Sequence, residues 1–69
     1  MQRVSVESSN IASVGFDSDS ATMEVEFKNG AVYQYFDVPE RTYDALRDAA
    51  SVGGYLASHI KGAFRYSKV

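Results

Sequence analysis

Residues 22–36 constrain the fold more than any other part of the chain, because they describe a β-hairpin almost completely. From residue 22 to residue 28, apolar side chains alternate with charged ones, which is the period of a half-buried strand. Asn29-Gly30 follows, and both residues tolerate the positive φ angles that tight hairpin turns require. Residues 32–36 are then the returning strand.

The turn leaves two registers open, and they place Tyr33 and Tyr35 on opposite faces of the sheet. In a two-residue loop, Phe27 pairs with Val32, and the tyrosines join the glutamates on the charged face. In a three-residue loop with a glycine bulge, Val25 pairs with Tyr33, and the tyrosines lie beside the apolar side chains of the first strand. The first register makes the tyrosines an exposed pair, and the second places them mostly in the core.

Gln34 favours the second register. In the first register its amide lies among apolar side chains, where an unpaired amide costs about 1–3 kcal/mol. The second register leaves Val32 and Phe36 partly exposed unless another element covers them. A one-residue slip is costly when only one face is buried, so we predict the second register.

Further strands are predicted on both sides of the hairpin. Residues 11–16 alternate so that Ala12, Val14 and Phe16 share one side, and residues 17–20 form a turn. Residues 1–7 are either an edge strand or an ordered arm. Residues 64–69 alternate again and form a last strand.

Two short helices are predicted between the hairpin and the last strand. Asp37-Val38-Pro39-Glu40 has the spacing of a helix N-terminus, with Asp37 as the cap and Glu40 reaching back. Apolar residues at helical spacing follow, and Gly53-Gly54 is expected to end this helix. A shorter helix then stops at Gly62. The fold class is therefore α+β: an antiparallel meander of three to four strands with two short helices on one face, ending in a C-terminal strand.

A chain of 69 residues has room for one core, so residues 1–69 are expected to be a single domain. It has no cysteine and one histidine, so disulfides and a zinc site are not expected to stabilise it, and nine Tyr and Phe residues supply buried area instead. No apolar run is long enough to span a bilayer, and the N-terminal residues lack the apolar core of a secretory signal. We therefore expect a cytoplasmic location.

Catalysis is not expected, because the chain contains none of the common nucleophile, phosphate-loop or metalloprotease motifs. His59 lies on a short predicted helix near Lys61, where a surface or half-buried position is more common than a role as general base. Asp17 and Asp19 have a spacing found in calcium loops, but the other ligands are missing, so a plain turn is expected. No metal or cofactor is predicted.

Charge is distributed unevenly. The net charge is −2, which argues against strong, sequence-indifferent binding of nucleic acid. Residues 1–60 contain four basic and nine acidic side chains, whereas residues 61–69 contain three basic side chains and no acidic one: Lys61, Arg65 and Lys68. The C-terminal segment is therefore the only basic stretch. Three charges make a modest patch, and a solvated strand face is the more common reason for such a pattern than a binding site.

Two binding hypotheses remain open. One is RNA or single-stranded nucleic acid. Its bases would stack on aromatic residues and its phosphates would lie on basic ones; the candidates are Tyr33, Tyr35, Tyr66 or Phe64 for stacking and Lys61, Arg65, Lys68 and Arg41 for phosphates. The other hypothesis is a protein partner or a homodimer, through exposed apolar positions such as Val32 and Phe36 or through a sheet edge.

The stretch Phe27-Lys28-Asn29-Gly30-Ala31-Val32-Tyr33-Gln34-Tyr35, followed by Val38-Pro39, resembles the central Tyr-x-Tyr motif of the KTSC domain. The surrounding pattern is also similar. It consists of Ser8-Ser9 and Ile11, Ser51-x-Gly53-x-Tyr55, and Ile60-Lys61 with Phe64, so the resemblance covers nearly the whole chain.

The KTSC family takes its name from the C-terminus of certain lysyl-tRNA synthetases. The resemblance implies a small bacterial or phage protein that works by binding, in a family whose function is unestablished and for which the synthetase fusion suggests RNA. We place RNA slightly ahead of a protein partner, with tRNA or single-stranded RNA as the expected ligand. Lys61, Arg65 and Lys68 are the predicted backbone contacts, and Tyr33 and Tyr35 match the motif and are predicted stacking residues.

Overall fold

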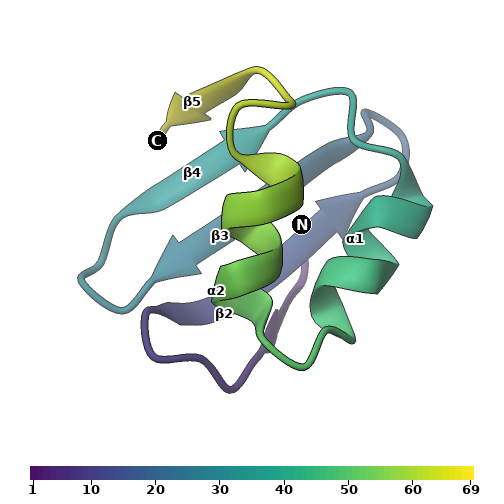
Figure 1. Cartoon of the computed structure of the whole chain (residues 1–69). Coiled ribbons are helices and arrows are strands. Elements are labelled where there is room, and N and C mark those ends of the chain that lie inside the picture. Colours follow the sequence, from purple (N-terminus) through teal and green to yellow (C-terminus); the bar gives the residue numbers. More distant parts are fainter.

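The five strands form one antiparallel sheet in the order β1-β2-β3-β4-β5, as a computed structural model of all 69 residues shows (Figure 1). The bounds of the strands are β1 (Arg3–Ser5), β2 (Ile11–Asp17), β3 (Thr22–Phe27), β4 (Val32–Tyr35) and β5 (Tyr66–Lys68). The chain passes from β4 to β5 through three helical segments, α1 (Glu40–Arg47), α2 (Val52–Tyr55) and the π-helical turn η1 (Leu56–Ile60). The predicted α+β meander with a C-terminal strand is therefore confirmed.

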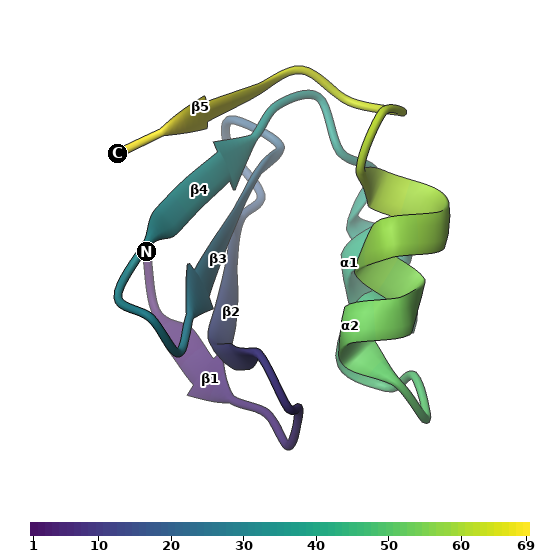
Figure 2. The same ribbon diagram turned by 60° about the vertical axis from the view of Figure 1, so that its left-hand side comes forward.

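All the helical segments pack on the same face of the sheet, which leaves the other face open (Figure 2). Because α2 continues directly into η1, the structure has two helical rods, as predicted. Residues 3–5 form a short edge strand paired with β2, which decides between the two alternatives for the N-terminal residues. None of the helical segments has the length and the hydrophobicity of a membrane-spanning helix.

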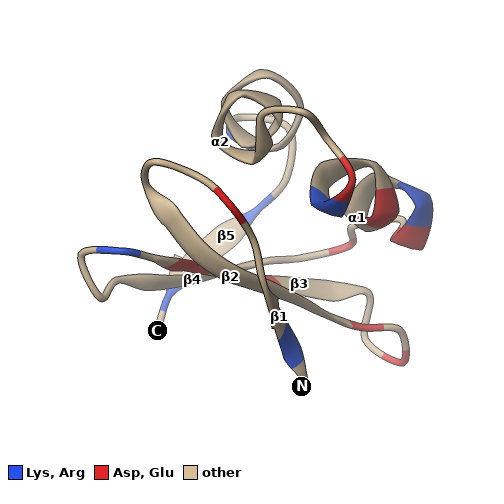
Figure 3. Ribbon diagram, turned by 90° about the horizontal axis from the view of Figure 1, so that it is seen from below, with Lys and Arg blue, Asp and Glu red and all other residues tan.

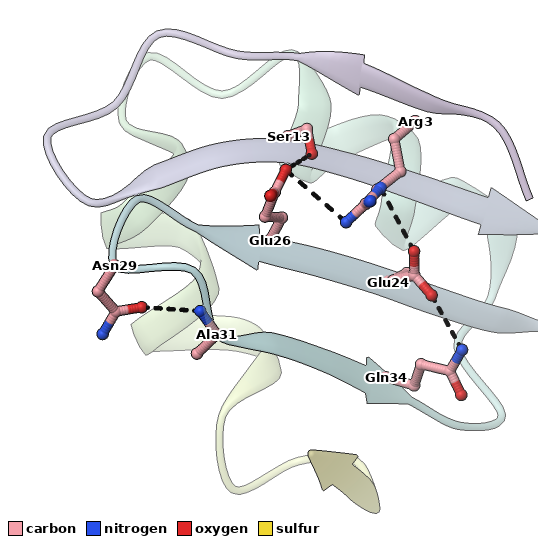
Figure 4. A network of polar contacts seen from close by, with 7 residues as sticks. All are labelled: Arg3, Ser13, Glu24, Glu26, Asn29, Ala31 and Gln34. Carbon is pink, nitrogen blue, oxygen red and sulfur yellow. Dashed lines mark hydrogen bonds and ion pairs between the residues drawn. The ribbon is translucent and has the colours of Figure 1, made fainter. Parts of the chain in front are cut away.

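The hairpin between β3 and β4 has the predicted second register. Val25 lies opposite Tyr33, and Phe27 closes the strand pair by donating its backbone N–H to the carbonyl oxygen of Ala31 at 2.8 Å. Gly30 has a φ of 93°, and the side chain of Asn29 accepts a hydrogen bond from the Ala31 N–H (Figure 4). The tyrosines of β4 therefore face the helices together with Met23, Val25 and Phe27.

The core lies between the sheet and the helices. It contains eleven buried hydrophobic side chains: Ile11, Val14, Met23, Val25, Tyr35, Val38, Tyr43, Leu46, Val52, Leu56 and Ile60. The predicted alternation of residues 11–16 holds for Val14 and Phe16 but is wrong at Ala12. A bulge between Ile11 and Ser13 makes Ala12 an extra residue, so Ile11 is fully buried in its place.

Two predictions about helix ends are wrong. Asp37 does not cap α1, because its φ is 58° and the residue that precedes the helix is Pro39, without a side-chain cap. Gly53-Gly54 does not end the first helix: α1 has already ended at Arg47, and the glycines lie inside α2. Ser51 caps α2 by accepting a hydrogen bond from the N–H of Gly54 at 3.1 Å. Gly62, with a φ of 81°, follows η1 as predicted.

Candidate nucleic-acid interface

A groove opens on the helix side of the sheet, between the β4–β5 edge and the end of η1. Its volume is about 640 Å³, within the range of about 300–1,000 Å³ that is typical of small-molecule sites. Its lining consists of four aromatic residues, two lysines and three small or polar residues: Phe27, Tyr33, Tyr35, Tyr66, Lys61, Lys68, Asn29, Ala31 and Gly62. We call this surface the aromatic groove.

The pairing of β4 with β5 brings most of these side chains together. Tyr33 lies opposite Lys68, and Tyr35 lies opposite Tyr66. Paired residues of an antiparallel sheet project from the same face, so these four side chains share the helix side. Sequence reasoning predicted both strands but not their pairing, since the two helices separate them in the chain.

The aromatic rings of the groove form a continuous row across β3, β4 and β5. The ring of Phe27 meets that of Tyr33 edge to face at 5.7 Å between centroids, and Tyr66 lies 5.9 Å from both Tyr33 and Tyr35. Tyr35 is only 3% exposed, Tyr33 is half-buried and Tyr66 is 62% exposed. The rings therefore differ in exposure, from Tyr35 in the core to Tyr66 at the surface.

Burial raises the pKa of the Tyr35 phenol, and the nearby phenols of Tyr33 and Tyr66 raise it further. Both effects act against the negative charge of a phenolate. Tyr35 therefore keeps its proton at neutral pH, and its hydroxyl remains a hydrogen-bond donor at the floor of the groove.

Lys61 is positioned by the π-helical turn. Its backbone N–H donates to the carbonyl oxygen of Leu56 at 2.9 Å, which closes η1, and its φ and ψ of −63° and 129° then turn the chain out of the helix. The Lys61 ammonium lies 5.7 Å from the centroid of the Phe27 ring. Phe27 was not among the predicted site residues. In the sequence, Phe27 is recognisable only as the last apolar residue of its strand. Its contact with Lys61 could not be predicted, because that contact depends on how η1 packs against the sheet.

No acidic side chain lines the aromatic groove. The glutamates of β3 project from the opposite face, where Arg3 pairs with Glu24 at 3.4 Å and with Glu26 at 3.8 Å (Figure 4). Ser13 and Gln34 donate one hydrogen bond each to these carboxylates. The segment from η1 through β5 is likewise free of acidic positions, whereas α1 has acidic and basic positions side by side (Figure 3). The glutamates therefore do not oppose an anion in the groove.

The structure does not bring Arg65 together with the two lysines. The backbone of Arg65 pairs with Phe36, and its guanidinium contacts the Phe36 ring and the carboxylate of Asp37, the latter at 2.9 Å. Arg65 instead lines a second, shallower hollow with Phe36 and Phe64. Its predicted contact with RNA stays a prediction.

The remaining sequence candidates lie outside the aromatic groove. His59 is exposed, and its ring lies 4.3 Å from that of Tyr55. Asp17 accepts hydrogen bonds from the Asp19 N–H and from Ser20 in a turn, as expected. No group of three or more His, Asp or Glu side chains is arranged to hold a metal ion. Val32 and Phe36 are half-buried.

Comparison with known proteins extends over the whole chain. A protein of Stutzerimonas stutzeri, described as uncharacterized, is 37% identical over all of this chain and 99% of its own length. The crystal structure of a KTSC domain protein from Yersinia pestis, 40% identical, superposes with a TM-score of 0.93 over 99% of this chain and 96% of the other.

Part of a much larger protein is also similar. The lysine–tRNA ligase of Trichormus variabilis is 38% identical over 91% of this chain, which corresponds to 11% of the ligase. The family model of the KTSC domain matches residues 7–64. This chain therefore belongs to the KTSC domain family.

Proposed function

We propose that this chain is a non-catalytic binding domain that takes single-stranded RNA in its aromatic groove. The observation that carries the proposal is the groove itself, in which two lysines flank an aromatic row and no acidic side chain is present. Proteins that bind single strands combine a basic groove for the backbone with aromatic rings for the bases. The net charge of −2 does not oppose this, because the acidic side chains lie elsewhere.

The similarity to part of a lysine–tRNA ligase supports the same ligand class. That enzyme acts on tRNA by its name, and a small domain within it can contribute affinity for the RNA without taking part in the reaction. Two lysines supply few phosphate contacts, so we expect weak binding that is strongest at low salt.

The proposal is tested by comparing three polyanions at 25 mM salt, of which the duplex has the highest charge. A single-stranded ribo-octamer, the same octamer in a duplex, and a poly-glutamate peptide of matched charge are titrated against the protein by fluorescence anisotropy. We expect the single strand to bind at least fivefold more tightly than either of the others. Equal binding of the octamer and the acidic peptide would contradict the proposal, because a site for any polyanion would explain it.

A protein partner is the second candidate, and one observation favours it: both edge strands expose an apolar or aromatic side chain, Val4 on β1 and Tyr66 on β5. Exposed edges can pair with a strand of another chain. Association that is insensitive to salt, with a diffusion coefficient that falls as protein concentration rises, would indicate this function instead. Val32 and Phe36, which the sequence suggested as exposed apolar contacts, add no support for a protein partner. Both side chains are half-buried, and Arg65 covers part of the Phe36 ring.

A further inference from the structure

One ring of the aromatic groove is far more exposed than the others. Tyr35 is buried, and the Lys61 ammonium lies over one face of the half-buried Phe27 ring. Tyr33 is half-buried, with Phe27 on one side and Tyr66 on another. Tyr66, the most exposed aromatic ring of the row, stands on the edge strand with its two tyrosine neighbours tilted at 46° and 39°.

Packing does not account for an exposed tyrosine at this place. Tyr66 is absent from the core and from the partly buried hydrophobic side chains that pack against it, whereas Tyr33, Phe27 and Phe64 belong to that second group. Its cross-strand contact with Tyr35 is a single tilted ring pair at the edge of the sheet, which contributes little to stability. An exposed ring held in place by its neighbours is instead suited to stacking, because little side-chain freedom is lost when a base binds.

Two positive charges flank this ring. Lys68 is two residues away on the same strand, so it projects from the same face, and Lys61 lies across the groove at the end of η1. An unpaired nucleotide can offer a free face of its base and has a phosphate on either side of it along the backbone. A base inside a duplex has both of its faces covered by its neighbours and cannot offer one to a protein ring.

We propose that Tyr66 is the stacking platform of the groove and that the groove takes one unpaired nucleotide, with its base on the Tyr66 ring and its flanking phosphates at Lys61 and Lys68. This inference rests on the proposed function and specifies its ligand. Tyr33 and Tyr35, the tyrosines of the family motif, then act as positioning residues that hold Tyr66 rather than as stacking residues.

The experiment compares two probes of equal charge: the ribotetranucleotide rA₄ and a tetramer of the same backbone in which all four bases are absent. The wild-type protein should bind rA₄ about 5- to 150-fold more tightly, the range that one stacked base contributes. Tyr66→Ile keeps a strand-forming side chain without a ring and should bind both probes equally. Tyr66→Phe keeps the ring and should discriminate as the wild type does. Amide spectra of β4 and β5 establish that each variant retains the strand pair.

The outcomes separate the two levels of the proposal. If Tyr66→Ile still prefers rA₄, the role of Tyr66 is overturned while RNA binding stands. If the wild type binds both probes equally, no ring of the groove stacks on a base, and the role of Tyr66 and the proposed function fail together. If neither probe binds the wild type at 25 mM salt, the proposed function itself fails. Ring protons of Tyr66 that shift upfield with rA₄, and not with the base-free probe, would place the base directly on that ring.

Discussion

Replacing both groove lysines by glutamine should nearly remove the salt dependence of RNA binding. Each phosphate that a lysine neutralises on a single strand contributes a slope of about −0.7 to the plot of log affinity against log salt concentration. Lys61 and Lys68 are the basic residues of the groove, so the wild-type slope should be about −1.4. From 50 to 200 mM salt, the affinity should therefore fall about sevenfold for the wild type and about 2.6-fold for either single variant.

Anisotropy titrations of a labelled ribotetranucleotide at four salt concentrations measure these slopes. Two matched variants remove the same charge outside the groove: Arg41→Gln on α1, and Arg65→Gln, whose guanidinium is paired with Asp37. Both should keep the wild-type slope. A slope near −1.4 that survives in the Lys61→Gln/Lys68→Gln variant would refute the placement of the phosphates, and a slope reduced by Arg65→Gln would extend the site to the second hollow.

Three further predictions concern the fold around the groove. Gly15→Ala places a Cβ 2.8 Å from the carbonyl oxygen of Gln2, so β1 must shift. Urea unfolding should show that the free energy of unfolding falls by about 1–3 kcal/mol, and an unchanged value would mean that β1 does not pack against Gly15 as described. Leu46→Ala opens a cavity in the core and should cost about 2–5 kcal/mol by the same measurement, with a change below 1 kcal/mol contradicting the burial of Leu46. The pKa of Tyr35 is raised on folding, so the unfolded chain loses this proton first. The unfolding free energy should therefore fall as the pH rises from about 10, the ordinary pKa of tyrosine, to the raised pKa of the folded state, and should change no further through this group above it. Tyr35→Phe should lose less stability than the wild type, and identical alkaline profiles would contradict the raised pKa.

The hairpin could be predicted from the sequence because local and tertiary requirements agree there. Asn29-Gly30 indicates the turn, and the cost of burying Gln34 selects the register. In the structure Gln34 lies on the open face, and its amide donates a hydrogen bond to Glu24. In the other register this amide would lie among apolar side chains without a hydrogen-bond partner. The same register places Tyr33 and Tyr35 on the helix side, and this determines where the aromatic groove can form.

The helix boundaries were predicted less well, because several residues suit more than one role. Aspartate three residues before glutamate is typical of a helix cap, yet Asp37 adopts a left-handed conformation and pairs with Arg65, 28 residues later in the chain. Gly53-Gly54 can end a helix or lie within one, and the cap formed by Ser51 decides between these alternatives.

The composition of the groove could be predicted only in part. Lys61 and Lys68 belong to the basic C-terminal segment, but the sequence does not show that Arg65, in the same segment, lies outside the groove. The pairing of Tyr35 with Tyr66 places Arg65 one residue out of phase, on the other face of the sheet. The alternating pattern of β5 is visible in the sequence, but its pairing with β4 is not. Two helical rods separate the two strands in the chain, and the sequence does not show how these rods pack.

The most direct test of RNA binding in the aromatic groove is a titration of the ¹⁵N-labelled protein with a short single-stranded RNA at 25 mM salt, followed by NMR. We predict amide shifts that cluster on β4, β5 and the end of η1, including Lys61, Tyr66 and Lys68, and that weaken as salt is added. Shifts confined to α1 or to the open face around Glu24, or no shifts at this salt concentration, would contradict an RNA site in the groove.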